Sequence, residues 1–214
     1  MSLSNELINS TLTTLYMVGT SSLISFVLGL PLGIYLFLGN HSLFSVGRLP
    51  HKTLGYLVNG ARSLPFIILM IAVIPFTRII IGTSIGTTAA IVPLSLAAIP
   101  FFARITETAL QTVPNGLLEA SMTFGASTRQ IVTKVLLAES WPSIIRGFTL
   151  TIIALIGYSA MAGAIGGGGL GDFAIRYGYQ RFDTHIMIIT IIVLVAMVQL
   201  LQILGDKLAT KLTR

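Results

Sequence analysis

The chain contains no cysteine, and only 9% of its 214 residues are charged. Without cysteine there are no disulfides and no thiolate metal sites within the chain. Soluble domains average about 25% charged residues, so this sequence is too poor in charge to cover a globular surface in water. With 54% hydrophobic residues and a mean hydropathy of +0.90, the composition indicates a protein whose solvent is the lipid bilayer.

Motifs for catalysis and for nucleotide binding are also missing. There is no Gly-x-x-x-x-Gly-Lys-Ser/Thr loop. Residues 166–171 match Gly-x-Gly-x-x-Gly, but they follow an apolar stretch and no strand, so we interpret them as a helix cap and a flexible hinge. His41, His51 and His185 are too far apart in the sequence to suggest a metal cluster. We therefore expect no catalytic residue, no bound metal and no cofactor in this chain.

Long apolar runs take the place of those motifs. A helix needs roughly 20 predominantly apolar residues to cross a bilayer. Five stretches approach that length, and they cover residues 12–38, 54–76, 86–103, 144–165 and 186–204. The sequence therefore predicts an all-α polytopic membrane protein, with five transmembrane helices in a single domain over residues 1–214.

The formal charge of +6 is unevenly distributed over the predicted loops. One side of the membrane receives ten basic residues and the other receives three. The smaller set consists of Arg78, Arg176 and Arg181. The larger set consists of Arg48, Lys52, Arg62, Arg104, Arg129, Lys134, Arg146, Lys207, Lys211 and Arg214. Because basic residues are retained on the cytoplasmic side, we expect the N-terminus outside, the C-terminus in the cytoplasm, and no binding to nucleic acid.

Acidic residues are absent between the predicted interfaces, and Glu107 lies just beyond the third stretch. Ion-driven carriers usually place ionisable groups inside the membrane to bind the coupling ion, so we expect transport here to be powered by another protein. Arg62 is the nearest exception. Two interpretations of it are open: snorkelling to the cytoplasmic interface, or lining a transport pathway.

The predicted loop over residues 112–141 has an organised pattern. Pro114 and Asn115 break the preceding helix, and an amphipathic run ends at Gly125. A second amphipathic run follows, and Ser140 with Pro142 carries start signals for the fourth membrane helix. We expect two short helices joined at the glycine. The pattern alone fits either an interfacial helix resting on lipid headgroups or a helix that docks on a cytoplasmic partner.

The residues in this loop resemble the signature of importer-type ABC permeases. The signature is Glu-Ala-Ala, three residues, Gly, nine residues and Ile-x-Leu-Pro, and here it reads Glu119-Ala120-Ser121, Gly125 and then residues 135–138 as Val-Leu-Leu-Ala. The resemblance implies a cytoplasmic coupling helix seated in a cleft of an ATPase subunit. We assign that contact to Glu119, Ala120, Ser121, Gly125 and Arg129.

Further stretches are similar to methionine importer permeases. They include Arg-Ser-Leu-Pro-Phe at 62–66, Ile-Pro-Phe-Thr-Arg at 74–78, Gly-Thr-Ser-Ile-Gly at 82–86 and Gly-Tyr-Ser-Ala-Met at 157–161. This resemblance implies a homodimer in the bacterial cytoplasmic membrane that works by alternating access. It also implies two cytoplasmic ATP-binding subunits, which bind ATP and Mg, and an extracytoplasmic substrate-binding protein.

Candidate pathway residues are polar or thioether side chains among apolar neighbours. They are Ser63, Pro65, Tyr158, Ser159 and Met161. The alternative is that they only pack helices together. The Gly-x-x-x-Gly motifs at 29–33 and 163–167 fit either a dimer seam or packing within one chain.

The resulting functional interpretation is an ATP-driven methionine importer permease that is itself no enzyme. One alternative is the same machinery with another amino acid or small polar solute as substrate. A passive channel or an intramembrane enzyme is a further alternative, and the segment around Glu119 argues against it because neither requires a motor subunit.

Overall fold

The computed structural model describes residues 3–44 and 48–213, apart from the side chains of residues 48–51. Three residues considered above lie outside this description: Arg214, and the side chains of Arg48 and His51. The described part of the chain contains helices and no strand, so the expected all-α class is confirmed.

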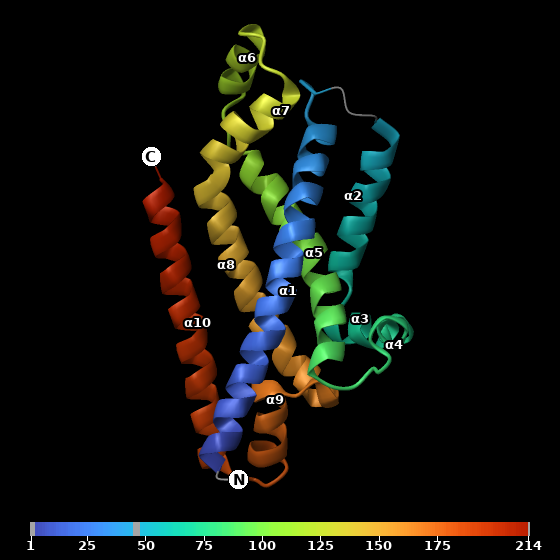
Figure 1. Ribbon diagram of the computed structural model, residues 1–214, viewed down its shortest axis with the longest axis vertical. Coiled ribbons are helices and arrows are strands. Elements are labelled where there is room, and N and C mark those ends of the chain that lie inside the picture. Colours follow the sequence, from blue (N-terminus) through green and yellow to red (C-terminus); the bar gives the residue numbers. More distant parts are fainter. Residues whose placement is uncertain (1–2, 45–47, 214) are drawn as a thin grey trace.

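Among the described residues, four helices are long and apolar enough to cross a membrane. They are α1 (Leu3–Asn40), α5 (Thr87–Leu110), α8 (Leu137–Ala162) and α10 (Thr184–Leu212). They form an elongated bundle in which the N-terminus lies at one end and the C-terminal end of α10 points toward the other (Figure 1). A bent pair of shorter helices supplies a fifth candidate crossing.

That fifth crossing is broken, although the sequence suggested one continuous stretch over residues 54–76. Two residues separate the end of helix α2 (Arg48–Ser63) from the start of α3 (Phe66–Ala72). The axes of the two helices differ by 108°. Pro65 causes the break, because it disfavours helical backbone in the preceding residue and itself has extended backbone (φ −56°, ψ 134°). Helix α4 (Ile74–Ile81) follows and ends at Gly82 with left-handed backbone (φ 85°).

Close approach of α1 to α5 depends on two glycines. A Cβ at Gly33 would collide with the carbonyl oxygen of Ala103 and the side chain of Thr106. A Cβ at Gly29 would lie 3.0 Å from the carbonyl oxygen of Ile99. These contacts lie within one chain, so the 29–33 motif serves intrachain helix packing.

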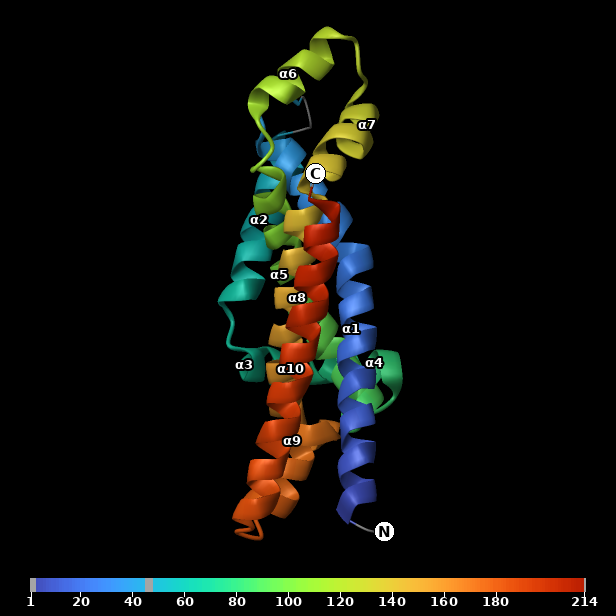
Figure 2. The same cartoon turned by 90° about the vertical axis from the view of Figure 1, so that its left-hand side faces the viewer.

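The predicted loop over residues 112–141 contains one separate helix, where two were expected. Helix α6 (Asn115–Thr123) is followed by Gly125 with left-handed backbone (φ 79°). Then α7 (Thr128–Gln130) and the π-helical η1 (Ile131–Leu136) continue directly into α8. Figure 2 shows α6 and α7 together at one end of the bundle.

The expectation that Ser140 and Pro142 start the fourth membrane helix is therefore wrong. The start signal is a capping box at Ser127, whose side chain accepts from the Gln130 backbone N–H while the Gln130 side chain accepts from the Ser127 backbone N–H. Ser140 instead donates to the Leu136 carbonyl inside the continuous helix, at 2.6 Å. The membrane helix is thus joined rigidly to the segment after Gly125.

The glycine run forms a reverse turn at the end of the bundle opposite α6. The π-helical η2 (Gly163–Gly167) leaves helical geometry at Gly166 (φ 92°), and Gly168 also has positive φ (79°). The chain then enters α9 (Gly169–Phe173) and the π-helical η3 (Ala174–Tyr179). The Leu170 backbone N–H donates to Thr14 Oγ1 at 2.8 Å, which fastens this turn to α1. Glycine is required here for the backbone conformation and not for nucleotide binding.

Apolar side chains cover the outside of the bundle as well as filling its inside. Helix α10 is the clearest case, because large aliphatic residues are exposed along much of its length. They are Ile188, Ile189, Ile191, Ile192, Val195, Leu200, Ile203, Leu204 and Leu208. A surface of this kind is stable against hydrocarbon and not against water.

Candidate coupling helix and transport pathway

The five residues expected to contact an ATPase lie together at the α6 end of the bundle. Glu119, Ala120, Gly125 and Arg129 are exposed, and Ser121 is half-buried. Glu119 makes no ion pair among the residues that the structure describes. The positive φ of Gly125 turns the chain from α6 toward α7, as the predicted glycine joint requires. The structure leaves all five available to a partner, and their role stays a prediction.

The inner side of α6 is anchored by Leu118, which is fully buried. It belongs to an apolar cluster, here called the coupling-end core, that draws side chains from α1, α5, α6 and η1 and from the segments between them. Its buried members are Phe37, Phe44, Leu110, Val113, Leu118, Ile131 and Leu136. This packing joins α6 to α1, α5 and the helix formed by η1 and α8, and close-packed side chains resist independent movement.

A polar joint lies beside this core. Glu107, in the last turn of α5, is only 2% exposed. It forms an ion pair with Arg104 (2.6 Å) and accepts a hydrogen bond from the Asn40 amide (2.9 Å). The next residue, His41, donates from Nε2 to Asn115 Oδ1 at 3.1 Å. The end of α1 is therefore bonded to both α5 and the first residue of α6.

Sequence reasoning placed Glu107 just outside a span and gave it no role. The sequence signal for such a residue is a single acid next to a long apolar stretch. If that acid is buried, it needs hydrogen-bond or ion-pair partners. The exposed apolar residues of this region were also missed. Leu117 is 42% exposed and Phe124 is 90% exposed, so both offer contact area to a partner.

The candidate pathway residues belong to two parts of the chain, the break between α2 and α3 and the C-terminal part of α8. Pro65 is exposed at the break between α2 and α3, beside Ser63, whose hydroxyl donates to the Asn59 carbonyl at 2.9 Å. Tyr158 on α8 stacks on Phe66 of α3, with ring centroids 4.6 Å apart and planes at 11°. The broken crossing and α8 therefore meet through two aromatic rings.

Met161 and Ser159 differ in their accessibility. Met161 is 38% exposed, whereas Ser159 is 2% exposed and donates to the Ile156 carbonyl of its own helix. Ser159 is therefore placed as a packing residue in this conformation. Both pathway assignments stay predictions.

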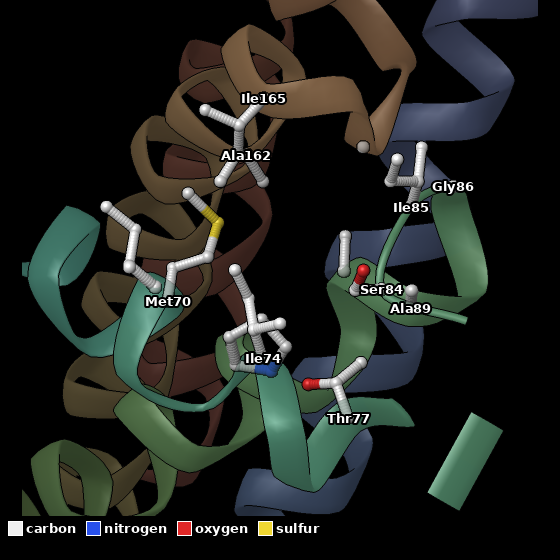
Figure 3. A pocket seen from close by; sticks show the side chains of 13 residues that line it. Met70, Ile74, Thr77, Ser84, Ile85, Gly86, Ala89, Ala162 and Ile165 are labelled. Carbon is white, nitrogen blue, oxygen red and sulfur yellow. The ribbon is translucent and has the colours of Figure 1, made fainter. Parts of the chain in front are cut away.

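A cavity of about 320 Å³ lies between the α3–α4 segment, the start of α5 and η2. Figure 3 shows its lining, which is largely apolar and includes Met70, Ile74, Ala89 and Ile165. Thr77 and Ser84 add hydroxyl groups on one side. The sequence did not single out this cavity, because its walls come from segments far apart in the chain. None of the five pathway candidates lines it, although Ala162, which follows Met161, does.

Asp172 and Arg176 form a surface ion pair at the opposite end of the bundle. Arg176 Nε donates to Asp172 Oδ1 at 2.8 Å, and this hydrogen bond raises the pKa of the Arg176 guanidinium above its ordinary value. The pair is exposed and joins residues four apart, so it fastens η3 to α9 with little net stabilisation. Among the described residues no group of three or more potential metal ligands comes together.

The family assignment follows from residues 27–214, which match the family described as the binding-protein-dependent transport system inner membrane component. The chain belongs to this family. The expected kinship with importer-type permeases is thereby confirmed, as is a multi-pass location in the inner membrane.

Individual relatives of this inner membrane component are similar over nearly their whole length. The chain is 49% identical to the probable D-methionine transport system permease protein MetI of Vibrio cholerae serotype O1, over 97% of this chain and 92% of the relative. It is 52% identical to the protein of the same description from Pasteurella multocida, over 94% and 93% of the two chains.

Solved structures agree with these relatives. A chain in the inward-facing MetNI methionine ABC transporter superposes with a TM-score of 0.96 at 44% identity, covering 100% of both chains. An amino acid ABC transporter solved with histidines gives a TM-score of 0.73 at 19% identity, which supports the fold alone. This inner membrane component therefore has the fold of an ABC importer permease.

Proposed function

We propose that this chain is the permease subunit of an ATP-driven importer that carries methionine across the bacterial cytoplasmic membrane. The observation that carries the proposal is the full-length match to a chain of a methionine ABC transporter, together with close relatives described as D-methionine permeases. The working unit is a homodimer with two cytoplasmic ATP-binding subunits, which bind ATP and Mg, and an extracytoplasmic binding protein that delivers the amino acid.

The coupling step begins at α6. When the ATPase subunits close on ATP, their clefts move α6 through the exposed residues around Glu119 and Phe124. Leu118 and the Asn40–Glu107 hydrogen bond pass that movement to α1, α5 and α8. Shifting a two-state population from 1:99 to 99:1 takes about 5.5 kcal/mol of differential binding, and ATP binding to the partner subunits is the source of that free energy.

The orientation follows from the distribution of basic residues. The end that carries α6 faces the cytoplasm, and the N-terminal end of α1 faces outside. Ten of the 13 lysine and arginine residues fall in segments assigned to the cytoplasmic side, and three fall on the other side. Cytoplasmic loops retain lysine and arginine, which supports this assignment.

The substrate passes the region where the broken crossing meets α8. Pro65 leaves the backbone non-helical there, and the Phe66–Tyr158 stack narrows the same region. Irregular backbone at membrane depth is tolerated where it lines a cavity. Met161 and the apolar cavity of Figure 3 suit the thioether side chain of methionine.

The test is reconstitution of the permease with its ATPase subunits and binding protein in sealed vesicles. Radiolabelled D- and L-methionine should accumulate against a gradient only with ATP on the ATPase side. Competition by unlabelled amino acids identifies the substrate, and stronger competition by another amino acid would replace methionine in the proposal. Uptake that only equilibrates, with or without ATP, would indicate a passive channel and would reject the importer.

A second variant tests the coupling helix itself. Scrambling residues 119–125 should abolish accumulation while leaving membrane insertion intact, because the motor then has no surface to move. Insertion is checked by the yield of folded dimer in detergent. Undiminished accumulation by the scrambled permease would show that these residues are not the coupling element.

A further inference from the structure

Three arginines from three different helices line one open pocket. Arg62 is in the last turn of α2, Arg104 is in α5 and Arg146 is in α8. The pocket has a volume of about 360 Å³, which lies within the usual range for small-molecule sites. The rest of its lining includes Leu150 and Gly147, so the arginines share the pocket with apolar groups.

The positive charge of this pocket is only partly neutralised. Arg104 is paired with Glu107 at 2.6 Å. Arg62 and Arg146 are exposed and have no carboxylate partner within the part of the chain that the structure describes. Arg62 lies over the Phe101 ring at 5.8 Å, a contact that orients a guanidinium without cancelling its charge. Two arginines without a carboxylate partner, next to apolar side chains, favour binding of an anion.

Arg62 connects this pocket to the candidate pathway. It also lines a small cavity that Phe66 and Tyr158 border, so Arg62 borders both spaces. Along α5, the small cavity contacts Ala97 and Phe101, whereas the arginine pocket begins at Arg104 and extends toward α6. The arginines therefore lie just beyond the aromatic stack, on the α6 side.

We propose that this pocket is an oxyanion site that receives the carboxylate of the transported amino acid after it passes the Phe66–Tyr158 stack. The inference rests on the proposed function, since it assumes that an amino acid travels this way. Arg62 and Arg146 hold the carboxylate by charge-assisted hydrogen bonds, and the apolar wall at Ile105 supports the side chain. Arg104 adds positive potential while it remains bonded to Glu107.

The chain's lack of cysteine permits a local probe. Leu150 lines the pocket and is 55% exposed, so Leu150→Cys can carry a trifluoromethyl label there. The complex with the ATPase subunits, without nucleotide, is placed in phosphatidylcholine nanodiscs and titrated with methionine and with methioninol, in which CH₂OH replaces the carboxylate. A complex without Leu150→Cys gives the background fluorine signal.

We expect methionine, and not methioninol, to shift the fluorine resonance. Arg62→Gln and Arg146→Gln should each weaken the methionine response about tenfold, the usual scale for a hydrogen bond to a charged group. Lys207→Gln is the matched control, because it removes one positive charge from the exposed surface of α10, outside the pocket. Equal responses to methionine and methioninol, or equal losses in all three variants, would overturn the proposal.

An anionic lipid headgroup also presents an oxyanion and could bind the same arginines. A second experiment distinguishes the lipid from the amino acid. Nanodiscs containing phosphatidylglycerol are compared with those of phosphatidylcholine alone. If phosphatidylglycerol abolishes the methionine response, and native mass spectrometry finds that lipid on the wild type but not on Arg146→Gln, the pocket is a lipid site and the carboxylate assignment fails. An unchanged methionine response in both lipids supports the assignment.

ATP-driven uptake in vesicles separates failure of this inference from failure of the proposed function. Methionine accumulation by the wild type, with no carboxylate-dependent signal at residue 150, rejects the oxyanion site alone. Absence of ATP-dependent methionine accumulation by the wild type rejects the proposed function, and this inference with it.

Discussion

The side-chain amide of Asn40 donates a 2.9 Å hydrogen bond to Oε1 of Glu107, joining the last residue of α1 to the last turn of α5. Glu107→Ala removes this bond and the ion pair with Arg104. We expect a loss of about 2 kcal/mol in the free energy of unfolding, less than for a fully buried pair because the Arg104 side chain is 36% exposed. Denaturant titration of the purified permease measures it. Glu139→Ala, at an exposed position of α8, is the control, and an equal loss there would refute the role of the joint.

Leu118 and Leu117 are neighbours on α6 with opposite environments, since Leu118 is 0% exposed and Leu117 is 42% exposed. Leu118→Ala should lower the free energy of unfolding by about 2–4 kcal/mol, because it opens a cavity in the coupling-end core. Leu117→Ala should leave stability nearly unchanged and weaken binding of the ATPase subunits. Thermal unfolding and co-purification of the subunits measure the two effects. Similar destabilisation by both changes would contradict the burial pattern.

Gly125 has positive φ (79°), and a Cβ at this position would meet nothing within 4 Å. Any cost of substitution is therefore a backbone cost. Gly125→Val should lower the free energy of unfolding by about 1–2 kcal/mol, because a branched residue is disfavoured in left-handed backbone. Gly125→Asn should lower the free energy of unfolding by a smaller amount, because asparagine tolerates that conformation. ATP-dependent uptake should fall in the same order, and equal activity of the two variants would show that the turn at this residue is unimportant.

Gly33 and Gly19 both lie on α1 and differ in what faces them. Gly33→Ala places a methyl group against the Ala103 carbonyl oxygen and Thr106, whereas Gly19→Ala meets nothing within 4 Å. We expect Gly33→Ala to lower the thermal midpoint and the yield of folded protein, because α1 must separate from α5. Gly19→Ala should match the wild type. A folded, equally stable Gly33→Ala protein would show that the two helices need no such close approach.

Met161 and Ser159 separate a pathway effect from a folding effect. Met161→Trp, at a 38% exposed position, should reduce uptake by obstruction while the ATPase subunits still bind. Ser159→Trp, at a 2% exposed position, should instead destabilise the bundle by overpacking. Uptake assays and thermal unfolding of the two variants distinguish these outcomes. Unchanged uptake by a folded Met161→Trp permease would remove Met161 from the pathway.

Local features of this protein could be predicted from composition and spacing. Apolar runs of membrane length and the uneven basic residues indicate a polytopic membrane protein, and the motif from Glu119 to Gly125 adds a resemblance to importer-type permeases, which implies a coupling helix. The break at Pro65 was not predicted, because the apolar pattern continues through residues 54–76. Proline restricts the residue before it, but the 108° angle between α2 and α3 depends on how α3 packs.

The sequence by itself determined the solvent and the class of fold, because both depend on hydrophobicity and on its spacing along the chain; the contact site for the ATPase subunits stays a prediction from the family resemblance. Only the tertiary structure decided that α7, η1 and α8 are continuous, that Glu107 is bonded to Asn40, and that Arg62, Arg104 and Arg146 share one pocket. Those relationships join residues on different helices or replace a local start signal with a better one. These contacts depend on how the helices pack against one another. Residue spacing along the chain does not predict that packing.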